Sequence, residues 1–393
     1  MNRVSPALKS LPDRRTVSNL VLGTGFALTG AGTVMLGVIL PVLSKQLGLR
    51  DDTAGFLFFL QFLGSSLGAA ITGHNHLRWL RAGYGLLAVS ACVLVFAGLR
   101  LVFPVFFCFG LGLGTTMTAT SLLCADRYSE ELAAKLQRLN FAWAIGAATA
   151  PMLFLPYLHM TTLRPLFFTF QGLFLALLFW VFLRESQETP GLRAAMDQRS
   201  PRSARPRGSL PALVALAFCA VGVEATLSGW LTTYSHRADP AHTAGTVLAI
   251  ALFWFGMMFS RFVFSTRLLS IVGTRRVMRL TLCCLAASVV LLIFAHTPAS
   301  IRVGSALAGL SLGPLYPLLL SFMLEFTSRG WIFAVGGIGA AIFPWFTGLL
   351  SAHYGSLRYG LAVPCAAALL MVALAPIGLR KAASSTPPMA SEP

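Results

Sequence analysis

Residues 219–234 read CAVGVEATLSGWLTTY, and Glu224 is the only charged side chain among them. The stretch lies within a longer run, residues 208–236, that contains no other Asp, Glu, Lys or Arg. Because about 20 apolar residues in a helix cross the hydrocarbon core of a bilayer, this run predicts a membrane-spanning helix. Glu224 is then expected near the middle of the membrane.

Long runs without charge recur along the whole chain. Eleven further runs of at least 18 residues contain no charged side chain: 16–44, 53–77, 82–99, 101–125, 139–163, 165–183, 240–260, 280–301, 303–324, 330–357 and 359–379. Only 11% of the residues are charged, whereas about a quarter are charged in soluble domains. Outer-membrane strands need only about 10 residues, so runs of this length predict helices. The sequence therefore predicts an all-α membrane protein with twelve transmembrane helices.

The basic residues are distributed unequally between the two ends of these helices. When the connections are assigned alternately to two sides, 22 Lys and Arg residues fall on one side, 7 on the other, and Arg261 inside a helix. Since cytoplasmic loops are enriched in Lys and Arg, the asymmetry predicts an inner-membrane protein with both termini in the cytoplasm. The net charge of +17 is therefore explained by the orientation of the protein in the membrane, and we do not interpret it as a sign of nucleic-acid binding.

The longest polar segment divides the chain into two halves. Residues 184–209 are rich in Pro, Ser and Arg and are interpreted as a cytoplasmic linker. The linker separates an N-terminal six-helix bundle, residues 1–183, from a C-terminal six-helix bundle with a short tail, residues 210–393. Two six-helix halves suggest an internal repeat.

Two short strings support that repeat. IGAATAP at residues 145–151 matches IGAAIFP at 338–344, and GLGLG at 110–114 matches GLSLG at 309–313. Packing of small residues between helices could also produce such strings without a repeat. Small residues allow close helix contact and Pro allows bending, and four positions are expected to serve in this way: Gly146, Pro151, Gly339 and Pro344.

Twelve helices in two parallel halves resemble the major facilitator superfamily, and several motifs resemble its fucose/galactose/glucose:proton symporter branch. Gly222, Glu224, Trp230 and Tyr234 are similar to the G-x-E…W…Y helix of that branch, and Asn140, Gly146 and Pro151 to its N…G…P helix. The resemblance implies alternating access and import of a sugar with protons. Unlike the fucose permease type, the first helix contains no acid, so a single carboxylate would have to suffice for proton coupling.

Glu224 is the candidate for that coupling. An ionised side chain at mid-membrane is costly, so the carboxyl is expected to face the bundle interior or to be neutral. It could take up a proton on one side of the membrane and release it on the other. Two alternatives stay open, namely a neutral packing residue and a substrate ligand that does not titrate. Ser228 lies one turn further along the same helix face and could share hydrogen bonds with it.

Polar and aromatic side chains at mid-helix are the candidates for substrate binding, because amides, hydroxyls and indoles suit sugars. They are Gln61, Thr115, Thr116, Asn140, Trp143, Gln171, Ser228, Trp254, Tyr316 and Trp345. Arg261 is interpreted as a gating or structural charge, with Asp126 or Glu325 as a partner.

The sequence shows no cofactor or metal site. His74 and His76 form an H-x-H pair without a third ligand, and no G-x-x-x-x-G-K nucleotide loop is present. We therefore expect a transporter and not an enzyme, driven by a proton gradient, with a small-molecule substrate and the lipid bilayer as partners, acting as a monomer. The alternative functions are export of drugs or other amphiphiles, and a membrane receptor without transport activity.

Overall fold

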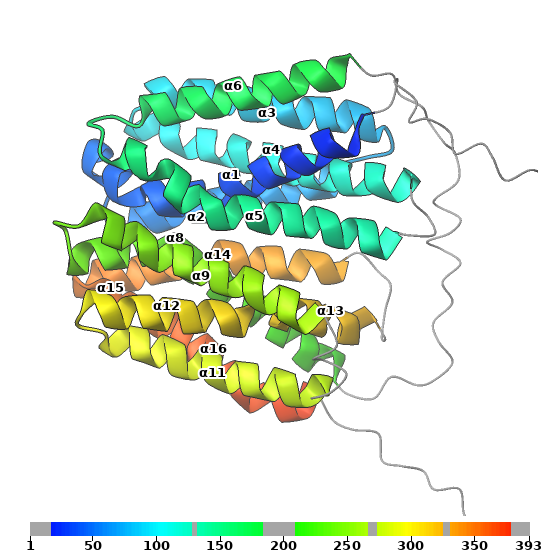
Figure 1. Cartoon of the computed structure of the whole chain (residues 1–393). Coiled ribbons are helices and arrows are strands. Elements are labelled where there is room, and N and C mark those ends of the chain that lie inside the picture. The colour runs from blue at the N-terminus through cyan, green and yellow to red at the C-terminus, as the bar shows by residue number, and fades with distance from the viewer. Residues whose placement is uncertain (1–16, 128–131, 184–208, 266–272, 325–330, 379–393) are drawn as a thin grey trace, which may run out of the picture.

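The computed structural model describes residues 17–127, 132–183, 209–265, 273–324 and 331–378, and the regular elements in these ranges are all helices. Twelve stretches of the described chain are long and apolar enough to cross a membrane. The predicted all-α fold class with twelve transmembrane helices is therefore confirmed. Figure 1 shows the helices packed lengthwise in one bundle.

The N-terminal half contains six long helices, and the C-terminal half contains six spans, of which two are broken. The first half comprises α1 (Asn19–Leu47), α2 (Asp51–Ile71), α3 (His76–Phe96), α4 (Leu99–Arg127), α5 (Leu132–Leu158) and α6 (Arg164–Phe182). The second comprises α8 (Leu210–Ala238), α9 (Thr243–Ser265), α11 (Thr274–Phe294), α12 (Pro298–Leu312), α13 (Leu315–Leu324), α14 (Trp331–Tyr354), α15 (Leu357–Gly360) and α16 (Ala362–Gly378). The tenth span runs through α12 into α13, and the twelfth through α15 and α16.

Local signals in the sequence explain where several helices begin and end. Ser18 accepts a hydrogen bond from the Val21 amide at the start of α1, and Gly48 ends that helix with φ of 64°. A left-handed residue of this kind favours glycine. Thr297 and Ser300 form a reciprocal capping box at the start of α12.

Successive spans run in opposite directions, so the bundle has two ends. We call the end at which α6 ends and α8 begins the linker face, and the opposite end the short-loop face. Connections of a few residues join α1 to α2, α3 to α4 and α8 to α9 at the short-loop face.

The two halves repeat the same close helix contacts. A Cβ atom on Gly146 of α5 would overlap the backbone carbonyl of Ala27 in α1, and a Cβ atom on Gly339 of α14 would overlap that of Phe218 in α8. Helices α5 and α14 are the fifth spans of their halves, and α1 and α8 are the first. Glycine at these two positions lets equivalent helices touch through their backbones.

A second pair of glycines repeats in the same way. A Cβ atom on Gly110 of α4 would meet the carbonyl of Gln61 in α2, and one on Gly309 of α12 would meet that of Phe253 in α9. The repeated strings in the sequence therefore occupy equivalent contacts in the two halves.

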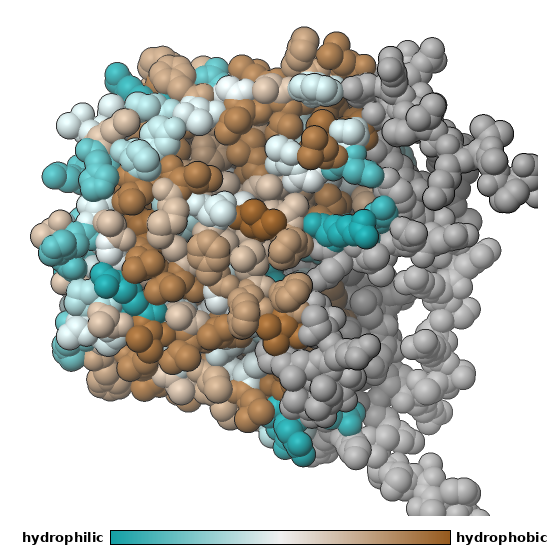
Figure 2. All heavy atoms as spheres, viewed as in Figure 1, coloured by the Kyte–Doolittle hydropathy of each residue, from teal (hydrophilic) through white to brown (hydrophobic). Residues whose placement is uncertain are grey.

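Within the described residues, the main contacts between the halves come from three helix pairs: α1 with α8, α2 with α14, and α5 with α9. Large apolar side chains that these contacts do not cover lie on the outside, where Phe96, Phe179 and Phe294 are more than half exposed. Figure 2 shows hydrophobic residues spread over the middle of one face of the molecule and hydrophilic residues gathered toward its ends. An exposed apolar surface of this extent fits contact with lipid chains.

Candidate functional site

The charges of Glu224 and Arg261 meet inside the C-terminal half. Arg261 Nη2 lies 3.7 Å from Glu224 Oε2, and the side chains are 24% and 17% exposed. Glu224 is at the middle of α8, while Arg261 is in the last turns of α9, toward the linker face. The distance is an ion contact and exceeds the length of a hydrogen bond. Each charge lowers the cost of placing the other within the membrane.

A broken helix holds Arg261 in place. Arg261 Nε donates a hydrogen bond to the Gly313 carbonyl at 3.2 Å. In a continuous helix that carbonyl would accept from the amide of residue 317, but Pro317 has no N–H. Pro314 and Pro317 lack N–H donors and so interrupt the ladder between α12 and α13, although the Gly313 amide still donates to the Gly309 carbonyl and the Leu318 amide to the Pro314 carbonyl. The sequence GPLYP therefore frees a carbonyl that orients the guanidinium group.

Tyr316 completes a cluster of three titratable side chains, which we call the charged cluster: Glu224, Arg261 and Tyr316. Tyr316 is close enough to Glu224 for the two groups to interact electrostatically. Its ring lies beside Gly336 of α14, where a Cβ atom would come within 3.6 Å of it. Three elements, α8, α9 and α13, thus contribute one polar side chain each.

Two tryptophans lie face to edge across the boundary between the halves, and we call them the aromatic pair. The ring centroids of Trp143 in α5 and Trp254 in α9 are 5.5 Å apart with an interplanar angle of 73°. Both indole Nε1 atoms are buried without a hydrogen-bond partner among the described residues. A buried indole N–H usually has a partner, so this pair can offer two donors to a bound molecule.

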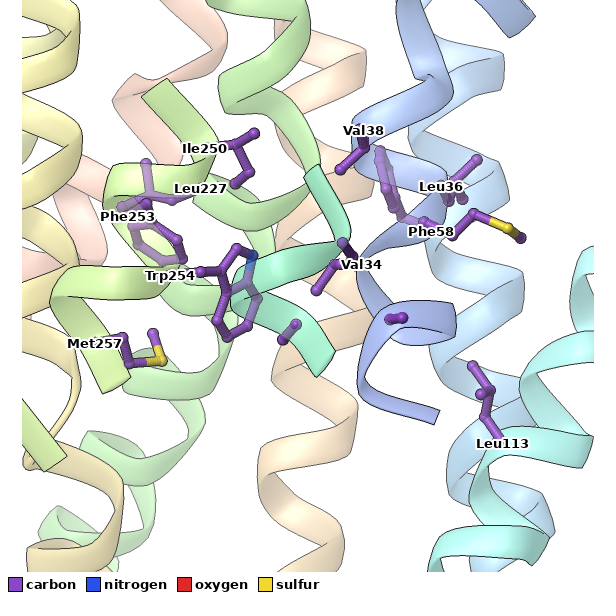
Figure 3. Packing of buried hydrophobic residues seen from close by; sticks show 14 of the residues in the cluster. Val34, Leu36, Val38, Phe58, Leu113, Leu227, Ile250, Phe253, Trp254 and Met257 are labelled. Carbon is purple, nitrogen blue, oxygen red and sulfur yellow. The ribbon is translucent and has the colours of Figure 1, made fainter. Parts of the chain in front are cut away.

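Figure 3 shows the surroundings of the aromatic pair. Trp254 belongs to the buried hydrophobic cluster, with Val34 of the N-terminal half on one side of it and Phe253 and Met257 of the C-terminal half on the other. These three neighbours are all buried. The indole donors are therefore set in an apolar environment.

Trp254 and the charged cluster share one helix face. Trp254 and Arg261 are seven residues apart on α9. Seven residues make about two turns, so the side chains point to the same side and lie about 10 Å apart along the axis. A molecule of that length could touch both.

Two other predicted binding residues belong to α2 and α14, the helices that pack together across the boundary between the halves. Gln61 of α2 is 1% exposed. Its Nε2 donates to the Thr33 carbonyl at 3.0 Å, while its Oε1 has no partner among the described residues. Trp345 of α14 packs on Phe56 and Phe59 of α2, with centroid distances of 5.8 and 5.2 Å. Gln61 thus offers one acceptor, and Trp345 joins the two halves.

The remaining predicted binding residues are not brought together with the charged cluster. Thr115 donates to the Gly68 carbonyl within the N-terminal half, and the Thr116 hydroxyl faces Gly83 of α3. Asn140 is exposed, and Gln171 is on α6, which packs mainly on α3. Ser228 is buried, and its backbone carbonyl lies against Gly37 where α8 meets α1.

The sequence predicts Asp126 or Glu325 as the partner of Arg261, and the structure describes a different one. Glu325 lies outside the described residues, and the position of the Asp126 side chain at the end of α4 is likewise not described. The described partner is Glu224. One signal was available, because a lone acid and a lone base on adjacent apolar helices are expected to pair.

The motif residues Gly222, Trp230 and Tyr234 hold helices together. Trp230 is fully buried and donates its indole N–H to the Pro344 carbonyl of α14 at 2.9 Å. The Tyr234 hydroxyl donates to the Leu292 carbonyl of α11 at 2.6 Å. A Cβ atom on Gly222 would overlap the ring of Phe343. Of the four motif residues, Glu224 alone belongs to the charged cluster.

An ion pair that sequence reasoning missed closes the short-loop face. Arg237 of α8 donates to both carboxylate oxygens of Asp51 in α2, at 2.8 and 2.5 Å. Ser351 of α14 donates to the same carboxylate. We call these three residues the short-loop latch, since they join the two halves at that face.

Neighbouring glycines bring α2 and α14 together beside the latch. A Cβ atom on Gly348 would overlap the Asp51 carbonyl, and one on Gly55 would lie 3.0 Å from the Trp345 carbonyl. In this structure the halves are therefore in close contact toward the short-loop face.

His74 and His76 lie at the connection between α2 and α3. Within the described ranges, no group of three His, Cys, Asp or Glu side chains is arranged to hold a metal ion.

Twelve spans in two equivalent halves, with a charged cluster inside one of them, define a class of multi-pass membrane transport proteins. The model of the Major Facilitator Superfamily matches residues 22–330. The chain therefore belongs to this superfamily, whose members are transporters rather than enzymes. A search of curated protein sequences gives no match.

Solved structures show the same fold at low sequence identity. A D-xylose-proton symporter is 14% identical with a TM-score of 0.69, covering 90% of this chain and 96% of its own. The nucleoside transporter NupG is 13% identical with a TM-score of 0.65, covering 91% and 96%. The human organic anion transporter MFSD10 (TETRAN) is 16% identical with a TM-score of 0.63, covering 93% and 100%. At these identities the likeness concerns the fold alone.

Proposed function

We propose that this protein is a proton-coupled secondary transporter that moves a small organic solute by alternating access of its two halves. The observation that carries the proposal is the contact between Glu224 and Arg261 at 3.7 Å within the membrane-spanning helices. A proton gradient is the driving force, and no cofactor takes part.

The charged cluster supports a simple coupling step. When Glu224 is ionised, its charge is balanced by Arg261. When Glu224 takes up a proton, Arg261 keeps its bond to the Gly313 carbonyl but loses its ionic partner. An unbalanced charge within the membrane is costly, up to about 3 kcal/mol at the centre on insertion scales and more by simulation. Protonation therefore alters the free energy of the site, and binding of substrate can respond to it.

The contacts between the halves support alternating access. Backbone contacts through glycines let helices slide with little rearrangement of side chains. The short-loop latch must open when the site faces that side, because Asp51 and Arg237 belong to different halves. The positive-inside bias supports a cytoplasmic linker face with both termini, in the inner membrane of a bacterial-type cell. We expect the protein to act as a monomer.

Two classes of cargo are supported by different observations. A sugar, implied by the motif resemblance, is supported by the Gln61 Oε1, which has no partner among the described residues, and by the two edge-to-face indoles. The D-xylose-proton symporter among the structural neighbours agrees with a sugar at the level of the fold. An amphiphile is supported by the apolar neighbours of Trp254 (Figure 3). Import with protons and export of amphiphiles are thus the two directions to test.

The experiment is uptake into proteoliposomes with an imposed pH gradient. D-xylose, L-fucose, uridine, a cationic dye and naphthalene-2-sulfonate are offered to the wild type, to Glu224→Gln and to Asp239→Asn as a matched acid outside the charged cluster. We expect gradient-driven movement of one solute in the wild type and in Asp239→Asn. We expect Glu224→Gln to lose uphill movement while retaining exchange of labelled for unlabelled solute. Equal uphill movement in Glu224→Gln contradicts the proposal.

A further inference from the structure

We propose that the substrate is an organic anion with a flat apolar body, whose acidic group binds Arg261 when Glu224 is protonated. The inference rests on the proposed function and names the substrate class of the same site. The anion replaces the Glu224 carboxylate as the partner of Arg261, and its body lies against the aromatic pair.

Arg261 has donors to spare for such a ligand. A guanidinium group carries five N–H donors. In the described contacts, Nε donates to the Gly313 carbonyl, and Nη2 lies 3.7 Å from Glu224 Oε2. That ion contact is longer than the 2.7–2.9 Å typical of a charge-assisted hydrogen bond. A carboxylate or sulfonate that reaches Arg261 at hydrogen-bond distance competes well with this loose contact.

Charge balance favours an anion over a neutral solute. Without substrate, ionised Glu224 and Arg261 have no net charge. With a proton on Glu224 and a monovalent anion on Arg261, the site again has no net charge. With a proton and a neutral sugar, the site carries one positive charge in a region of low dielectric, which is costly. The charged cluster is therefore suited to binding a proton and an anion together.

The apolar body is inferred from the aromatic pair. Trp254 lies two turns before Arg261 on one face of α9, about 10 Å along the helix axis. Trp143 brings a second indole from the other half, and both Nε1 donors are without partners among the described residues. Indoles bind flat apolar rings and donate to acceptor atoms at their edges. A system of one or two rings that carries an acidic group matches this separation.

The titratable groups near Glu224 are few. The helices packed on α8 are α1, α9, α12, α13, α14 and α16, and Arg261 and Tyr316 are the two such groups that they bring to Glu224. The other described titratable groups on these helices lie at or near the short-loop end: Lys45, Arg302, His353, Tyr354 and Cys365. On α8 itself, Cys219 precedes Glu224 by more than one turn, and Tyr234, His236 and Arg237 lie at the short-loop end. If the affinity for the anion depends on pH and Glu224→Gln removes that dependence, the titrating group is therefore the Glu224 carboxyl.

The test is binding of matched probes to the purified full-length protein. Naphthalene-2-sulfonate and benzenesulfonate are anions, and their sulfonamides have nearly the same shape without the charge. Affinity and proton uptake are measured by calorimetry between about pH 6 and pH 9 in buffers of different ionisation enthalpy. The variants are Glu224→Gln, Arg261→Gln, Trp254→Ala and, as a matched control, Arg279→Gln, an exposed arginine on α11.

The expected results are specific to each variant. In the wild type and Arg279→Gln, the sulfonates bind about tenfold tighter than the sulfonamides, and their affinity falls as the pH rises. Glu224→Gln removes this pH dependence and the accompanying proton uptake, but keeps the preference for sulfonates. Arg261→Gln loses the preference. Trp254→Ala weakens binding of the naphthalene probe more than that of the benzene probe.

Three outcomes overturn the anion assignment: equal affinity for sulfonates and sulfonamides, an unchanged preference in Arg261→Gln, or no binding by either sulfonate. The proposed function is judged separately, by Glu224-dependent uphill movement of any of the solutes offered in proteoliposomes. If a neutral solute is taken up against its gradient and Glu224→Gln loses this uptake, the proposed function stands and the assignment of an anionic substrate is wrong.

Discussion

Arg261 and Glu224 lie 3.7 Å apart between α9 and α8, and the Arg261 Nε is bonded to the carbonyl that Pro317 leaves free. The guanidinium group is thus fixed by the backbone and not by Glu224. The carboxyl can change its charge while its partner stays in place. This separation of anchoring from ion pairing is the physical basis of the proposed coupling.

The first prediction concerns the stability of this pair. Arg261→Gln leaves Glu224 without its partner, and we expect it to lower the free energy of unfolding by about 1–3 kcal/mol. The double variant Arg261→Gln with Glu224→Gln should recover most of that loss. Thermal unfolding in detergent measures both effects, with Arg279→Gln as the exposed control. Additive losses in the double variant would show that the two side chains do not interact.

The second prediction concerns the short-loop latch. Asp51→Asn or Arg237→Gln removes an ion pair between the halves, so the short-loop face should open more often. The expected result is a several-fold faster thiol labelling of Ala54→Cys, a position that is 1% exposed, relative to labelling of the parent protein. Exchanging the two charges, Asp51→Arg with Arg237→Asp, should restore slow labelling.

Arg50→Gln is the matched control for the latch. Arg50 lies beside Asp51, is mostly exposed and pairs with Asp52 at 3.5 Å. Labelling of Ala54→Cys should not change in that variant. Fast labelling in Arg50→Gln, or slow labelling in both latch variants, speaks against the latch.

The third prediction concerns the repeated glycines. Ala at Gly146 or Gly339 places a methyl group on a backbone carbonyl of the facing helix, and each change should destabilise the protein by about 1–3 kcal/mol. Gly172 has no atom within 4 Å of its added Cβ, so Gly172→Ala should be neutral or slightly stabilising. Melting temperatures check all three, and equal stability of the three variants would contradict the backbone contacts.

The fourth prediction concerns Trp230, a motif residue, and Trp254, a predicted binding residue. Trp230→Phe leaves the Pro344 carbonyl without its donor, so we expect a loss of about 1–2 kcal/mol in stability and unchanged affinity for substrate. Trp254→Phe removes an indole N–H that has no partner among the described residues, so we expect nearly unchanged stability and weaker binding. The reverse pattern would exchange the roles of the two residues.

The helices could be predicted from the sequence because run length alone decides whether a segment can cross a bilayer. Depth could be predicted as well, since Glu224 does lie at the middle of α8. The direction of each side chain around its helix could not. Membrane helices are apolar on all sides, so no polar face marks the interior. Thr115 was therefore a candidate beside Gln61, although Thr115 bonds within its own half.

Contacts between distant segments were also beyond the sequence. Asp51 and Arg237 are 186 residues apart. Both lie at helix ends, where charged residues are common in membrane proteins. Only their arrangement in space shows that they form the latch. The same holds for Trp143 and Trp254, which come from different halves. The motif resemblance identified Trp230 and Tyr234, but their hydrogen bonds to backbone carbonyls give them a structural role.

The measurement that tests the central claim most directly compares uphill uptake with exchange for wild type and Glu224→Gln in the same proteoliposomes. We predict that Glu224→Gln abolishes pH-driven accumulation and keeps labelled solute exchange, because the substrate site persists while the titrating group is gone. Accumulation in Glu224→Gln equal to that of the wild type, with the same pH dependence, would contradict a proton-coupling role for Glu224.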